Sequence, residues 1–174
     1  IDSTVSKIKK FIDKHEKVFL RTNNETAANG MFLLDGESPK ELIIEKIQEL
    51  VQRCKSFLKK RKDTRIVLVQ FIIPEEKKGY MDLYRVHLLF GNILSYYVVT
   101  AKLDIFHNCD MGANNLNRFI DLNKSISRIV DKHKNTILAA SKVLGCNLGA
   151  VEFFIRDGNP VFLEFNPMWG GQAS

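Results

Sequence analysis

Apolar segments of strand length alternate with amphipathic helical segments along the whole chain, and this order constrains the fold more than any other feature. Two pairs of apolar segments, at residues 83–101 and 151–171, surround short turns rich in Gly and Asn, and each pair predicts an antiparallel hairpin. Hydrophobic residues repeat at helical spacing before and between them. Because strands and helices are interleaved and antiparallel hairpins dominate, the sequence predicts an α+β fold.

The hydrophobic pattern and the turn residues locate each expected element. The second helix has the clearest start, because Ser38, Pro39 and Glu41 form a capping box with proline at the first helical position. The near-continuous apolar run at 65–74 is typical of a strand buried on both faces. The expected order is a helix within 4–17, strands at 17–22 and 31–34, the helix after Ser38, a strand at 65–74, a hairpin at 83–101 turning at Gly91-Asn92, a helix at 117–144, and the final hairpin.

Composition excludes several classes of protein. The sequence contains no run of apolar residues long enough for a membrane span, so no membrane association is expected. Its 3 cysteines are odd in number and far apart, which favours a reducing compartment, the cytoplasm, over a disulfide framework. The net charge of +6 is compatible with an anionic partner such as a nucleotide. The basic cluster at 59–65 lacks interleaved aromatic residues, so nucleic-acid binding is not expected.

Polar residues interrupt the apolar pattern of the final hairpin. Glu164 and Asn166 are two residues apart, so on a strand they point to the same face. The turn decides whether Glu152 joins them. A three-residue loop at 157–159 places Glu152 opposite Glu164, whereas a two-residue loop at Asp157-Gly158 turns it to the other face. Under the first register, two carboxylates and an amide oxygen converge, and these ligands suit Mg²⁺.

The same alternation also fits an ordinary strand whose polar side chains face water, and periodicity alone favours that interpretation. Three histidines are also candidates for side-chain chemistry, and we assign them no role. His15 and His133 lie in charged helical stretches and are expected to face solvent. His87 in the 83–101 hairpin has no predicted function, and Trp169 is either an acceptor-pocket residue or a core anchor.

The segment GAVEFFIRDGNPVFLEFNPMWGG, residues 149–171, resembles the closing motif of the ATP-grasp superfamily. In that family an acidic residue on one strand and a Glu-x-Asn on the next hold the magnesium ions of MgATP. Three earlier segments resemble further elements of the family in the same order. Residues 17–33 resemble the phosphate-binding strand and loop, residues 66–74 the adenine-side strand and hinge, and residues 82–98 the hairpin that follows. The resemblance therefore covers nearly the whole chain.

The resemblance implies roles for individual residues. Glu152, Glu164 and Asn166 would bind Mg²⁺. Arg21 takes the place of a Lys on the α- or β-phosphate, a substitution usual in one subgroup, and Arg85 takes that of a basic residue near the γ-phosphate or acyl phosphate. A guanidinium can bind phosphate oxygens in pairs. The remaining nucleotide contacts would come from Gly30, Gln70, Phe71, Ile72 and Ile73, the last four largely through backbone groups.

The family fold has two α+β subdomains that enclose a nucleotide site. Residues 1–65 would form the small lid, and residues 66–174 the larger, metal-bearing part. The family's N-terminal domain is expected to be missing from this sequence. The implied activity is that of a MgATP-dependent ligase, which activates a carboxylate as an acyl phosphate for attack by an amine or related nucleophile. The alternative is a non-catalytic ATP-binding scaffold or assembly factor. The phosphate loop with only Gly30 favours the scaffold, whereas the three metal-ligand positions favour the enzyme.

Overall fold

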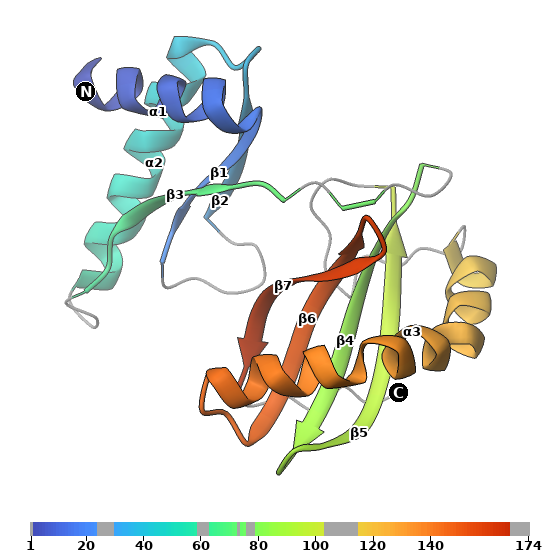
Figure 1. Ribbon diagram of the computed structural model, residues 1–174. Helices are drawn as coiled ribbons and strands as arrows, with labels where there is room; N and C mark the ends of the chain where they lie inside the picture. Colours follow the sequence, from blue (N-terminus) through green and yellow to red (C-terminus); the bar gives the residue numbers. More distant parts are fainter. Residues whose placement is uncertain are drawn as a thin grey trace. The chain divides into compact units, whose positions relative to one another are not determined.

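The computed structural model divides the chain into two compact units, Ile1–Ile73 and Pro74–Ser174 (Figure 1). It describes residues 2–23, 30–58, 63–72, 74–75, 79–102 and 115–167. These residues form helices and two antiparallel sheets, so the α+β fold class is confirmed. Within the described part of the chain, no helix is both long and apolar enough to cross a membrane.

The first unit packs two helices on one three-stranded antiparallel sheet. The central strand alternates half-buried and buried residues, and its buried residues Val18 and Leu20 face the helices. Residues of both helices, including Ile8 and Ile43, complete one hydrophobic core with them. The elements are α1 (Asp2–His15), β1 (Lys17–Thr22), β2 (Met31–Asp35), α2 (Lys40–Leu58) and β3 (Ile66–Gln70), and the strand order is β2-β1-β3.

The strand β3 differs from its sequence-based description in two ways. It is an edge strand paired only with β1 among the described strands, and Val69 is 39% exposed, so it is not buried on both faces. Its pairing with β1 also places it in the first unit. The structure therefore divides the chain after Ile73, and not after residue 65 as the sequence suggested.

The start of α2 also differs from the expected capping box. The Ser38 hydroxyl accepts a hydrogen bond from the Asp35 backbone N–H at 2.9 Å and donates one to the Asp35 carboxylate at 3.0 Å. Within the described residues no hydrogen bond joins Ser38 to Glu41. Ser38 therefore closes the turn that follows β2, and α2 begins two residues later at Lys40.

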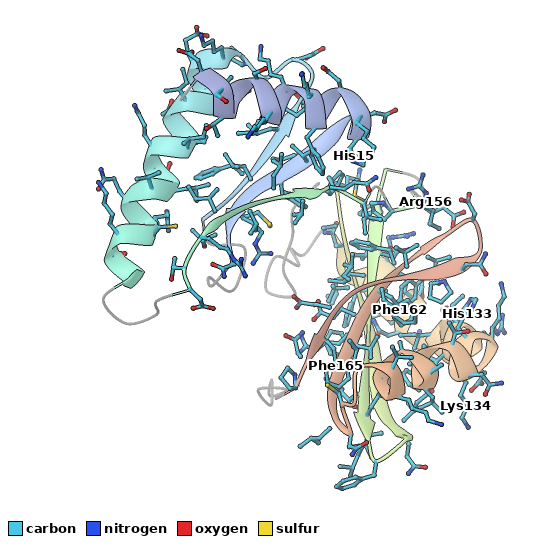
Figure 2. All side chains as sticks on the ribbon, turned by 60° about the vertical axis from the view of Figure 1, so that its left-hand side comes forward. His15, His133, Lys134, Arg156, Phe162 and Phe165 are labelled. Carbon is cyan, nitrogen blue, oxygen red and sulfur yellow. The ribbon has the colours of Figure 1, made fainter. Side chains whose placement is uncertain are left out.

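The second unit packs one long helix against a four-stranded antiparallel sheet (Figure 1). Alternate residues of the central strands, such as Val86 and Phe153, form a core with Val130 and Ile137 of the helix. Phe162 and Phe165, labelled in Figure 2, pack against the same core. The elements are β4 (Met81–Leu89), β5 (Asn92–Ala101), α3 (Leu116–Val143), β6 (Leu148–Arg156) and β7 (Asn159–Asn166), and the strand order is β5-β4-β6-β7.

Two-residue turns close both hairpins of this sheet. Asp157 and Gly158 have φ values of 51° and 73°, and Phe90 and Gly91 have values of 46° and 76°. Positive φ at both central residues is typical of the type I′ turn, whose twist matches that of the flanking strands. The first hairpin therefore turns at Phe90-Gly91, one residue before the predicted Gly91-Asn92.

Gly149 in β6 allows the next strand to approach closely. A Cβ atom at this position would overlap the ring of Phe165 and the backbone carbonyl oxygen of Asn166. Because one of the two obstacles is backbone, a larger residue would push β7 away from β6. A glycine here thus sets the position of the strand that carries Glu164 and Asn166.

His133 is buried in the core, contrary to the expectation that it faces solvent. It lies on the face of α3 that packs on the sheet, is 7% exposed, and is labelled in Figure 2. Within the described residues, its Nε2 atom is buried without a hydrogen-bond partner. Burial, and to a lesser extent the charge of Lys132, lower the pKa of His133 below its ordinary value of 6.5.

The stability of the fold should therefore depend on the protonation of His133. The unfolded chain binds the proton at a higher pH than the folded protein, so this contribution is fully present above pH 6.5 and is lost as the pH falls below it. We expect His133→Leu to lose less unfolding free energy than wild type between pH 7.5 and 5, measured by urea denaturation. Equal losses in the two proteins would show that His133 protonation does not limit stability.

Candidate functional site

One lateral row of polar side chains crosses the second sheet on the face opposite α3. In β6, Val151 and Phe153 point into the core, so Glu152 between them points to the other face. Arg85 of β4 lies directly opposite Glu152, and Glu164 of β7 lies directly opposite it on the other side. This face, which carries Arg85, Glu152 and Glu164, is called the site face below.

A β-bulge brings the two carboxylates into the same row. The Asp157-Gly158 turn pairs Arg156 with Asn159, the register that by itself would turn Glu152 to the other face. The register shifts between Glu152 and Phe153, and the extra residue in β7 is Leu163. The shift restores the Glu152–Glu164 pairing. Glu152 and Glu164 therefore lie opposite each other, as under the first of the two registers that the sequence left open, but the cause is a bulge and not a three-residue loop.

Hydrogen bonds join the predicted metal ligands to one another and to Arg85. The Arg85 Nη1 atom donates to Glu152 Oε1 at 2.6 Å, and both side chains are largely buried, at 17% and 13% exposed. Asn166 Nδ2 donates to Glu164 Oε1 at 2.9 Å and to Glu152 Oε1 at 3.4 Å. The structure thus brings together all four residues that the sequence assigned to the metal and γ-phosphate side of the site.

The electrostatics of this cluster favour an added cation. Burial and the adjacent Glu164 carboxylate raise the pKa of Glu152, and Arg85 only partly opposes them. Two carboxylates that face each other in a partly buried site repel when both are ionised. A divalent cation between them would relieve this repulsion and would also favour their ionised forms.

The donor set fits Mg²⁺ in type, and it is small enough to leave coordination positions for water and phosphate. Glu152 and Glu164 supply carboxylate oxygens, and half a turn of the Asn166 amide would present its oxygen in place of its NH₂ group. Among the described residues, no group of three or more His, Cys, Asp and Glu side chains could hold a metal ion. This small set suits Mg²⁺, which is commonly held by one or two carboxylates together with water and substrate phosphates.

Arg85 retains binding capacity for an anion. Its Nε atom is buried and has no hydrogen-bond partner within the described residues. A buried donor without a partner costs free energy, and a charged one costs more. An anionic oxygen that reached this guanidinium would supply the acceptor that its Nε atom lacks.

The predicted nucleotide contacts lie in the first unit. Arg21 is half-buried in β1, between Met31 and Val67, and its Nε atom donates to the Thr22 carbonyl oxygen at 3.0 Å. Gly30, with φ of 58°, directly precedes β2. Gln70 is exposed at the end of β3, and Ile72 directly precedes Ile73, which lies outside the described residues.

Among the predicted nucleotide contacts, Phe71 is the residue whose surroundings most restrict what it could bind. Its ring is 5% exposed and meets the Phe19 ring edge-on at 5.1 Å. Its backbone N–H donates to the Lys17 carbonyl oxygen at 3.0 Å, extending the β1–β3 ladder. This N–H group is therefore already used within the first unit, and an adenine contact by the Phe71 backbone would depend on its carbonyl oxygen.

Sequence reasoning missed His87 and its neighbours, which share the site face with Arg85. The His87 Nδ1 and Ser95 Oγ atoms are 2.8 Å apart, and the His87 and Tyr97 ring centroids are 5.8 Å apart. Burial, and then the charge of Arg85, lower the pKa of His87. His87 is two positions after Arg85 along the strand, so period-two alternation was the signal that could have found it.

A second polar cluster lies on the opposite face of β4 and ties the sheet to α3. Asp82 is 5% exposed, and Arg118 Nη2 donates to its two carboxylate oxygens at 2.9 and 2.8 Å. Thr100 Oγ1 donates to Asp82 at 2.7 Å and accepts from Arg118 Nε at 2.9 Å. The guanidinium also stacks on Tyr80, with Cζ 4.9 Å from the ring centroid. Since its charges are paired, this cluster anchors the N-terminal turns of α3.

Comparison with known proteins identifies no family for this chain. No protein-family model matches it, and no curated protein matches its sequence. The chemistry of the site face is therefore the main basis for inferring a function.

Proposed function

We propose that this chain is the MgATP-binding part of an ATP-grasp ligase, which activates a carboxylate as an acyl phosphate for attack by an amine or related nucleophile. One observation carries the proposal: Glu152, Glu164 and Asn166 converge beside Arg85 on one face of a sheet. The resemblance of the whole chain to that superfamily, element by element, supports it. Two α+β units, each built on an antiparallel sheet, are compatible with the two subdomains of that fold.

Each residue of the site has a role in this chemistry. Glu152, Glu164 and Asn166 would hold the magnesium, which when bound offsets the negative charge of the phosphates. Arg85 would bind the transferring phosphoryl group, and Arg21 of the first unit an α- or β-phosphate oxygen. A carboxylate oxygen attacks the γ-phosphorus as its bond to ADP breaks. The amine then attacks the acyl carbon. The bond between this carbon and the phosphate oxygen breaks, and inorganic phosphate leaves. These residues act by position and charge, without a protein nucleophile.

The alternative is a non-catalytic scaffold that binds ATP without turning it over. The phosphate loop, with Gly30 alone, favours it, because few glycines leave less room for backbone N–H groups to surround phosphates. The two functions differ in one measurable respect. A ligase releases ADP faster when its carboxylate substrate is added, whereas a scaffold does not respond.

Calorimetric titration with ATP tests the metal site on which both functions depend. We expect the wild-type chain to bind ATP more tightly with Mg²⁺ than without it. Glu164→Ala should lose this magnesium effect, with MgATP affinity reduced at least roughly 100-fold, since even residues that only support metal ligands commonly account for 10- to 100-fold. Glu164 is exposed, so the change should leave the fold intact.

Asp131→Ala is the matched control. It removes an exposed carboxylate from α3, on the other side of the same unit, and should bind MgATP as the wild type does. Magnesium-dependent binding that survives in Glu164→Ala would contradict the assignment of this carboxylate to the metal.

A further inference from the structure

We propose that Arg85 changes partners when the metal binds: it releases Glu152 to the metal and takes a phosphoryl oxygen in its place. Metal and anion would then bind cooperatively, because the metal frees Arg85 for the anion and the anion frees Glu152 for the metal. This inference rests on the proposed function, since it assumes that Glu152 is a metal ligand, and it adds a coupling that the ligand assignment alone does not contain.

The first step is that one oxygen atom has two competing uses. Glu152 Oε1 accepts from Arg85 Nη1 at 2.6 Å and from Asn166 Nδ2 at 3.4 Å. Asn166 is also bonded to Glu164, so Oε1 is the Glu152 oxygen that lies beside the other two proposed ligands. A metal can use this oxygen only if the guanidinium withdraws from it or shares it, so Arg85 acts as a competitor for the metal.

The second step concerns the guanidinium after it has been displaced. The Arg85 side chain is 17% exposed, and its Nε atom already lacks a hydrogen-bond partner within the described residues. A largely buried cation without a counter-charge is strongly unfavourable. Metal binding alone therefore carries a penalty, and an anion that occupies Arg85 removes it.

The third step is the charge of the cluster. Glu152 and Glu164 together outweigh Arg85, so the cluster is negative and repels a phosphate when no metal is present. A divalent cation reverses the sign of the total charge, after which a phosphoryl anion is attracted. Coupling of this kind is reciprocal, so the anion must strengthen metal binding by the same factor.

Binding of Mn²⁺ alone, measured by the loss of the free-ion electron paramagnetic resonance signal, tests the competition directly. Removing the positive charge in Arg85→Met or Arg85→Gln should tighten Mn²⁺ binding by at least about 5-fold, the lower end of typical coupling factors. Arg128→Met, the same change at an exposed arginine of α3, should bind Mn²⁺ as the wild type does. Two neutral variants are used so that a folding defect in one, checked by circular dichroism, leaves the other informative.

Sulfate, a tetrahedral anion that binds free Mn²⁺ weakly, tests the coupling. Relative to chloride at equal ionic strength, sulfate should tighten Mn²⁺ binding to the wild type but not to the Arg85 variants. The proposal is overturned if the folded neutral variants bind Mn²⁺ no more tightly than the wild type, or if sulfate acts equally on all. If neither the wild type nor any variant binds Mn²⁺, the metal site itself is wrong, and with it the proposed function. If the wild type binds Mn²⁺ and Glu164→Ala does not, the proposed function is supported whatever the Arg85 variants show.

Discussion

Replacing Asp82 with Leu destabilises the second unit by about 3–5 kcal/mol, the usual cost of removing one partner of a buried ion pair. The substitution leaves Arg118, whose side chain is only 23% exposed, without the carboxylate that accepts both of its Nη2 hydrogen bonds. Thr100 Oγ1 loses its acceptor as well. The unfolding free energy of the full chain, from urea denaturation followed by circular dichroism, measures the effect.

A second substitution separates the charge from the packing. In Asp82→Leu/Arg118→Met both charges are absent, and apolar side chains of similar length can pack between β4 and α3. The double variant should recover most of the lost stability, because the penalty comes from the unpaired charge and not from the missing attraction. A loss below about 1 kcal/mol in the single variant, or no recovery in the double variant, would contradict this account of the cluster.

Phe153→Ala removes the largest completely buried side chain among the residues that the structure describes, and we expect it to lower the unfolding free energy by about 3–5 kcal/mol. The Phe153 ring stacks on Tyr84 with centroids 5.3 Å apart and meets Phe162 edge-on at 5.9 Å. Because these contacts join three neighbouring strands, the surrounding side chains cannot collapse into the space without moving the strand that carries Glu152. Urea denaturation of the full chain measures the loss.

Phe90→Ala is the matched control for this prediction. Phe90 is 73% exposed at the tip of the β4–β5 hairpin, so its removal deletes an equally large ring that buries little surface. Its effect should stay within about 0.5 kcal/mol, as is usual for surface substitutions. Equal effects of the two substitutions would mean that Phe153 is not the centre of the core.

Local patterns were sufficient to predict most elements of the fold. The spacing of Val5, Ile8, Phe11 and Ile12 predicted a helix with these residues on one face, and all of them except the half-buried Phe11 are buried. The strand at 17–22 and the helix at 117–144 agree with β1 and α3 to within a residue at either end. In each case neighbours along the chain determine the structure, through helical or strand periodicity, so the sequence contains the necessary information.

Burial was harder to predict than secondary structure. The run at 65–74 is apolar enough for a central strand, but a strand is buried on both faces only when other elements cover both, and β3 lies at an edge. His133 is the opposite case: its charged neighbours suggested solvent, whereas the helical period places it in line with Val130 and Ile137. Tertiary contacts decide burial, and the composition of a short segment does not report them.

The residues of the candidate site could be predicted from the sequence, but not all of the contacts between them. The identities of Arg85, Glu152, Glu164 and Asn166, read through the family resemblance, were sufficient to select four residues that the structure places together. The pairing of Arg85 with Glu152 could not be predicted, because it is determined by the order of the strands in the sheet. His87 was passed over because a bulge was thought necessary to bring it to this face, although simple alternation assigns it to the same face as Arg85.

The bulge at Leu163 means that the acidic pair depends on the strand register as much as on residue type. Leu163 has no assigned part in binding, yet because it is left out of the pairing, Glu164 lies opposite Glu152. If the same residues formed a regular ladder, Leu163 would pair with Glu152 and Glu164 would turn to the opposite face of the sheet. The transferable unit is therefore the whole segment from Glu152 to Asn166, with its turn and its irregularity, and not the motif letters alone.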